Sequence, residues 1–60
     1  MNISIREQRK GYYTFVVDLV VDDVNIEIRG RVVDGGIFIS PNPYSQKINR
    51  EVATFVKGLL

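Results

Sequence analysis

Arginine and aromatic side chains are spaced along this chain in a way that suits a ligand with phosphates and rings. Arg29 and Arg31 are two residues apart, and Phe38 follows beyond a glycine turn. Arginines hold phosphate groups, and aromatic rings give the bases of single-stranded nucleic acid a surface for stacking. On strands, such residues would share one face of a sheet with Tyr12, since side chains alternate between faces. Further basic residues could line the edge of that face: Arg6, Arg9 and Lys10.

Few residues of the types that usually carry out catalysis are present in this chain. The chain contains no histidine and no cysteine, so the usual general base, the commonest metal ligand and thiolate chemistry are missing. Asp22, Asp23 and Asp34 stand where turns favour aspartate, and no phosphate-binding, dinucleotide-binding or calcium-binding loop is present. We predict a protein that is not an enzyme, without cofactor or small-molecule substrate. A metal held by these three aspartates is the least favoured alternative.

The size and charge of the chain limit its partners. Its 60 residues carry a net charge of +1, so a basic site must be local, and we expect one domain spanning 1–60. Such a small domain buries only about 60% of the surface of its unfolded chain, which favours a homodimer. No apolar run approaches the ~20 residues of a membrane span, and no signal peptide is recognisable. We therefore expect a cytoplasmic protein with no membrane partner.

Alternation of apolar and polar residues predicts four strands. If Asp22-Asp23 forms a two-residue loop, the apolar positions of the two long strands face each other. The same register opposes Asp18 and Glu27, a like-charge pair that Arg29 or Arg6 could separate. The expected strands are 2–6, 12–21, 24–33 and 36–40. The expected pairs are Val21 with Val24, Leu19 with Ile26, Val17 with Ile28, and Tyr13 with Val32.

A helix is predicted at 43–58, where apolar residues recur every three or four positions. Asn42 is a plausible N-cap with Pro43 as the first helical residue, and Ser45 is a competing cap. The order β-β-β-β-α then predicts an α+β fold, in which a C-terminal helix covers one face of an antiparallel meander. No internal repeat is visible.

The sheet face that the predicted helix does not cover has two possible interpretations. Val16, Val20, Val33 and Phe38 make it more apolar than a solvated face should be, which is typical of a subunit interface. Its arginines and rings favour a nucleic-acid surface instead. We predict a small nucleic-acid-binding protein, for single-stranded DNA, single-stranded RNA or duplex DNA. The alternative is a protein-interaction module or inhibitor that caps a partner through the face or edge of its sheet.

Three segments resemble the stage V sporulation protein G (SpoVG) family. Leu19–Asp23 resembles a strand that ends in Asp-Asp, and Ile28–Pro41 resembles two strands around an Asp-Gly turn before a proline. Lys47-Ile48 then opens the helix. The resemblance covers about two thirds of the chain. It implies a dimeric, site-selective, non-enzymatic regulator of transcription that binds nucleic acid through a sheet-plus-helix fold.

A second segment, Gly36–Pro43 followed by a helix, is similar to the end of the positive cofactor four family of transcriptional coactivators. That likeness implies a dimeric β-β-β-β-α protein that binds single-stranded DNA.

Overall fold

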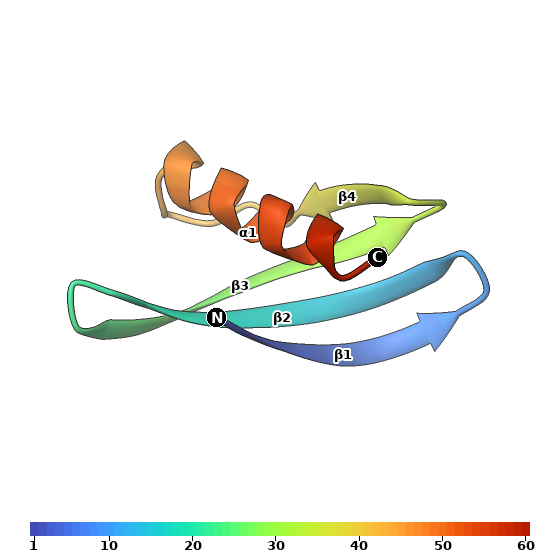
Figure 1. Ribbon diagram of the computed structural model, residues 1–60, viewed down its shortest axis with the longest axis horizontal. Helices are drawn as coiled ribbons and strands as arrows, with labels where there is room; N and C mark the ends of the chain where they lie inside the picture. Colours follow the sequence, from blue (N-terminus) through green and yellow to red (C-terminus); the bar gives the residue numbers. More distant parts are fainter.

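Four strands follow one another along the chain and pair in the same order, and a helix follows the fourth (Figure 1). The computed structural model describes residues 1–60, and each neighbouring pair of strands is antiparallel. The predicted meander with one C-terminal helix is therefore confirmed. The elements are β1 (Asn2–Arg9), β2 (Tyr12–Val21), β3 (Val24–Val33), β4 (Gly36–Ile39) and α1 (Gln46–Gly58).

The predicted register between β2 and β3 is also confirmed. Val21 pairs with Val24, and the ladder runs without a break to Tyr12 and Val33. The loop that sets it has Asp22 and Asp23 at φ 49° and 64°, a left-handed conformation that aspartate tolerates better than most residues. Because the loop contributes two residues, the apolar positions of both strands fall on one face.

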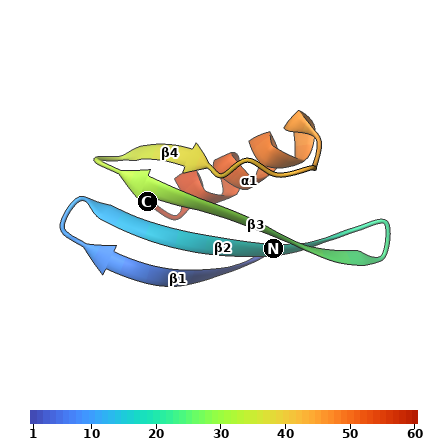
Figure 2. The same cartoon turned by 180° about the vertical axis from the view of Figure 1, so that it is seen from behind.

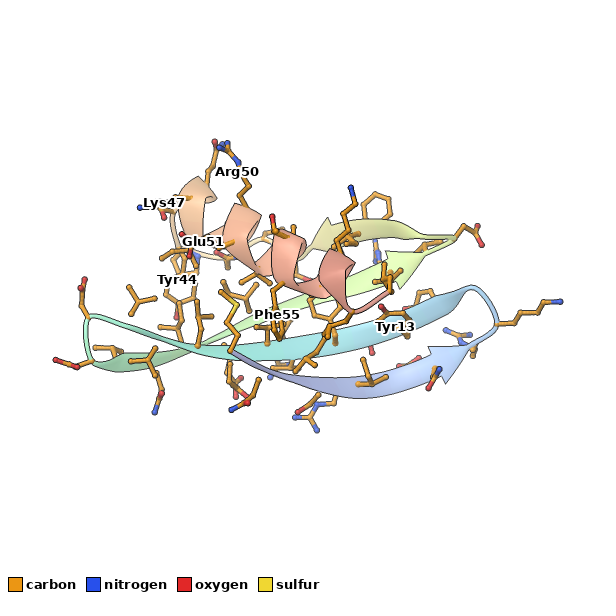
Figure 3. The ribbon with its side chains drawn as sticks, viewed as in Figure 1. Tyr13, Tyr44, Lys47, Arg50, Glu51 and Phe55 are labelled. Carbon is orange, nitrogen blue, oxygen red and sulfur yellow. The ribbon has the colours of Figure 1, made fainter.

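That face carries the core. The fully buried side chains are Phe15, Val17, Ile28, Val52 and Val56, and the last two come from α1. Sticks drawn on the ribbon show Phe55 reaching from α1 towards the sheet, whereas Arg50 points away from it (Figure 3). Lys47 and Glu51 are also exposed.

Gly30 makes room for the largest core side chain. It pairs with Phe15 across β2 and β3, and a Cβ on Gly30 would lie 2.5 Å from Cζ of Phe15 and 2.6 Å from the carbonyl oxygen of Phe38. The Phe15 ring thus lies over the bare backbone of Gly30. A side chain at this position would leave the ring no space.

The helix covers only part of the sheet. Viewed from either side, α1 lies along β3 and β4, and β1 forms the opposite edge (Figures 1 and 2). Apart from Ile3, which is half-buried against the core, every residue of β1 is exposed. Helix α1 is neither long nor apolar enough to cross a membrane.

The first strand is longer than predicted. The expected strand at 2–6 extends to Arg9, and the loop before β2 shrinks to Lys10-Gly11. A β-bulge between Ile5 and Glu7 makes this possible, because one extra residue on β1 keeps both its apolar start and its charged end in register with β2. The prediction failed here because charge alone does not end a strand that still has a neighbour to pair with.

The helix starts later than predicted. It begins at Gln46 instead of 43, and the hydroxyl of Ser45 accepts a hydrogen bond of 3.3 Å from the backbone N–H of Ile48. The prediction of Asn42 as N-cap was wrong because its side chain is used elsewhere. Its Oδ1 accepts from the Tyr44 N–H at 3.0 Å, and its Nδ2 donates to Oδ1 of Asn49 at 2.9 Å. Asn42 therefore ties the loop to the helix and leaves the cap to Ser45.

The fourth strand ends one residue earlier than expected, at Ile39. The backbone N–H of Ser40 still donates to the carbonyl oxygen of Arg29 at 2.8 Å, so the departure is small.

Candidate functional site

The face of the sheet opposite α1, called here the open face, collects most of the predicted site. Thr14 of β2 pairs with Arg31 of β3, and Arg31 pairs with Phe38 of β4. One row nearer the Lys10-Gly11 loop, Tyr12 pairs with Val33. Since directly paired residues point to the same side, the structure brings together the four predicted residues of β2, β3 and β4: Tyr12, Arg29, Arg31 and Phe38.

The bulge in β1 adds arginines to this face. Alternation from Ile5 on the core side places Arg6 on the open face, and the extra residue places Glu7 there too, opposite Thr14. Arg9 then pairs with Tyr12. The sequence predicted Arg6 and Arg9 only as an edge, whereas the structure sets Arg9 beside a ring of the face itself.

The guanidinium group of Arg9 lies over the ring of Tyr12. Its guanidinium carbon lies 4.6 Å from the centroid of the ring, within the range of a cation–π contact. Lys10 stands beyond, exposed in the loop. A base could stack on Tyr12 only by displacing Arg9, although a guanidinium plane is itself a surface on which bases stack.

Phe38 is the freely accessible ring of the face. It is 52% exposed, and a Cβ on Gly36 would lie 3.2 Å from its Cε2. The ring therefore leans over Gly36, towards the row of Tyr12 and Val33. The sequence-based prediction placed Gly36 at the start of the fourth strand but did not identify its contact with Phe38. A glycine two residues before an exposed aromatic on the same strand face was the available signal.

The arginines differ in how they are paired. Arg9 lies 3.5 Å from Glu7 and Arg29 lies 3.7 Å from Glu27, between guanidinium and carboxylate atoms. Both pairs are exposed, so each stabilises the fold by about 1 kcal/mol at most. Arg6 and Arg31 form no ion pair. Two guanidinium groups are thus free, and two are held weakly enough to exchange a carboxylate for a phosphate.

Charge is unevenly spread over the open face. Asp18 pairs with Glu27 towards the Asp22-Asp23 loop, and Arg29 neutralises only Glu27. Arg9 and Arg31 lie towards the other end. The predicted opposition of Asp18 and Glu27 is confirmed, and Arg29 forms an ion pair with Glu27 but not with Asp18. A polyanion would favour the end of the face near Tyr12 and Phe38.

The expected apolar patch on this face is smaller than the sequence indicated. Val16 is only 4% exposed, although it lies outside the core cluster, and Val33 is half-buried. Val20 is 65% exposed but sits near the Asp22-Asp23 loop, far along the strands from Phe38. Alternation alone does not reveal this burial of Val16. The open face therefore lacks a continuous apolar surface of the kind that forms a subunit interface.

The three candidate aspartates do not form a site. Asp22 and Asp23 are in the loop between β2 and β3, whereas Asp34 is in the loop between β3 and β4, at the opposite end of the sheet. All three have positive φ, as turn residues do. No group of three acidic residues is placed to hold a metal ion. The alternative of a metal held by these aspartates is wrong.

Two hollows adjoin the predicted residues. One of about 120 Å³ lies beside Phe38 and Arg31 and continues along Ile39, Ser40 and Pro41. A larger one of about 590 Å³ lies at the end of the sheet near Arg9, Lys10 and Tyr12, with Tyr13 and Leu60 among its other walls. The smaller hollow therefore lies at the β4 edge of the sheet, and the larger lies at the end that carries the Lys10-Gly11 loop.

No family model matches this chain, and neither a curated protein nor a solved structure matches it. What the open face can bind must therefore be inferred from its own residues.

Proposed function

We propose that this protein is a non-enzymatic nucleic-acid-binding protein that holds single-stranded DNA or RNA on its open face. The observation that carries the proposal is that four arginines and one freely exposed ring share that face, opposite the helix. Phosphates bound by guanidinium groups and bases stacked on aromatic rings are the two contacts that single strands make with sheet surfaces.

Each residue has a distinct part in this proposal. Arg6 and Arg31 are unpaired and take phosphates directly. Arg29 takes a phosphate in exchange for Glu27. Phe38 supplies the stacking surface, and Arg9 offers its guanidinium plane above Tyr12. Lys10, exposed in its loop, contributes charge from the edge.

The resemblance of the sequence to two nucleic-acid-binding families supports this proposal and extends it. Both families are dimeric and act in transcription, so we propose a cytoplasmic, homodimeric regulator. An exposed ring on the sheet face favours a single strand over a duplex, because paired bases cannot stack on protein rings.

Fluorescence anisotropy with labelled single-stranded DNA, single-stranded RNA and duplex DNA, each over a salt series, tests the proposal. We expect the logarithm of the affinity to fall linearly with the logarithm of salt concentration. Replacing Arg29 and Arg31 together by alanine should weaken binding to single strands. It should also reduce the slope by about 1.4, because each phosphate contact contributes about 0.7.

The helix supplies a matched control. Lys47 and Arg50 are exposed on α1, which packs on the other side of the sheet, so replacing both by alanine removes the same charge without touching the open face. The slope should then stay as in the wild type. If the wild type binds none of the three ligands even at low salt, the proposal is wrong and the protein-interaction module becomes the better reading. If both double variants lose binding equally, the site is wrong.

A further inference from the structure

The two edges of the sheet are protected to different degrees. β4 has four residues, lies along α1, and is followed by Pro41 and Pro43. β1 has eight residues and no neighbour on its outer side. Short edges, covering helices and prolines prevent a sheet from pairing with another chain, whereas a long open edge invites it. β1 is therefore the edge left available.

Within β1, the bulge divides a protected part from an open one. Arg6, Glu7 and Arg9 are charged, and the bulge before Glu7 disturbs the ladder. Charges and bulges are both devices that discourage pairing. The stretch from Asn2 to Ile5 has neither, since it carries no charge and pairs regularly with β2. An added strand would therefore lie along the first half of β1.

An apolar side chain on this half is uncovered. Ile5 pairs with Phe15, so it lies on the core side of the sheet, yet it is 48% exposed. Its partner Phe15 is fully buried under α1. Helix α1 comes close to the start of β1 but leaves Ile5 half exposed, and a further strand beside β1 would cover it.

We propose that a second copy of this chain covers Ile5, with the two β1 strands antiparallel about a two-fold axis at Ser4. In this register Ile3 opposes Ile5 of the second copy on the core side, which is apolar against apolar. On the open side, Asn2 opposes Arg6, and no like charges meet. A two-fold interface must be complementary to itself, and this segment is.

Neighbouring symmetric registers are less suitable. An axis at Ile5 would set Ile3 against Glu7 across the bulge, and an axis at Ile3 would need Met1, which lies outside the strand. The register at Ser4 pairs residues 3–5 of the two copies, with Asn2 opposite Arg6 where the bulge begins, and it joins the two sheets into one of eight strands. The open faces of the two copies then form a single surface, with both Arg6 side chains near its centre.

This inference rests on the proposed homodimer and not on nucleic-acid binding, so its test needs no ligand. Sedimentation equilibrium over a concentration series should show a dimer for the wild type. Ile5→Lys places a charge against Ile3 of the second copy and should weaken the dimer about tenfold or more. Val24→Lys is the control, because Val24 is 59% exposed at the start of β3, away from both edges, and it should leave the dimer unchanged.

Cysteine cross-linking gives a second measurement, which holds even if Ile5→Lys does not fold. The chain has no cysteine, so Ser4→Cys introduces a single thiol at the axis. Opposed residues of antiparallel strands have Cα atoms about 4.5–5.5 Å apart, which suits a disulfide. We expect Ser4→Cys to form a covalent dimer readily and Ser40→Cys, beyond β4, to form little.

A wild type that stays monomeric at every concentration would overturn both the homodimer and this interface. A dimer that Ile5→Lys leaves intact, or that Ser40→Cys links as readily as Ser4→Cys, would overturn the interface alone. If a different protein adds the strand, the wild type will be monomeric in isolation, and Ile5→Lys will lose the binding of that protein. This result would also overturn the proposal that a second copy covers Ile5. Anisotropy with single strands reports the nucleic-acid proposal separately.

Discussion

The guanidinium of Arg9 lies 4.6 Å above the ring of Tyr12, and the two residues are direct partners across β1 and β2. The bulge after Ile5 creates this relationship, because an extra residue moves the end of β1 to the open face. A contact of this kind contributes about 0.5–1 kcal/mol at an exposed site. It also means that the two rings of the open face are not equivalent, since Tyr12 is covered and Phe38 is free.

We therefore expect Phe38→Ala to weaken binding to single-stranded nucleic acid by about 5- to 150-fold, which corresponds to the 1–3 kcal/mol of one stacked base. The free energy of unfolding should change little, because Phe38 is outside the core cluster. Fluorescence anisotropy and thermal denaturation measure the two effects. Val20→Ala is the control on the same face. A loss of affinity as large in Val20→Ala would contradict the role of Phe38.

Gly36→Ala should act on the same ring without removing it. The new Cβ would lie 3.2 Å from Cε2 of Phe38 and 3.3 Å from the carbonyl oxygen of Val33. These distances are tight, and of the two neighbours the exposed ring is the freer to move. We expect shifted Phe38 ring resonances in NMR spectra and affinity between those of the wild type and Phe38→Ala. Unchanged resonances would show that the ring does not rest on Gly36.

Gly30→Ala should destabilise the fold. Its Cβ would meet both Phe15 and the backbone of β4, and overpacking of this kind costs about 1–3 kcal/mol. In a domain of this size each kcal/mol lowers the melting temperature by about 4–8 °C. Gly58→Ala is the matched control, because a Cβ there meets nothing within 4 Å and alanine favours helix. Equal melting temperatures for the two variants would refute the packing of Phe15 on Gly30.

Asp23→Gly should stabilise the hairpin of β2 and β3. Asp23 has a φ of 64°, and a left-handed backbone costs a residue with a side chain about 1–2 kcal/mol relative to glycine. Part of this gain is offset by the greater freedom of glycine in the unfolded chain, so we expect an increase of about 0.5–1 kcal/mol in chemical denaturation. Asp23→Ala should have the opposite sign. A stabilising alanine would mean that the loop adopts another conformation.

Much of the sheet follows from local pattern. The apolar positions of 12–21 and 24–33 coincide on one face only if the loop between them has two residues, so the register of β2 and β3 and the sharing of one face by Arg29, Arg31 and Phe38 were predictable. The bulge was predictable in principle too. With a two-residue loop at Lys10-Gly11, Ile5 would oppose Val16 on the open face, and one extra residue is needed to return it to the core.

What only the tertiary structure decided depends on contacts between distant segments. The hydrogen bond from Asn42 to Asn49 engages a side chain that would otherwise suit an N-cap. The two residues are only seven positions apart, but their spacing does not predict that the side chains meet. The cover over Val16, the ring of Phe38 on Gly36 and the exposure of Ile5 likewise depend on how far neighbouring side chains and α1 extend. The sequence alone determined the order of the four strands and the faces of β2, β3 and β4, because side-chain alternation is a local property. The accessible ring, the free arginines and the open edge were decided by packing, because burial is a property of the whole fold.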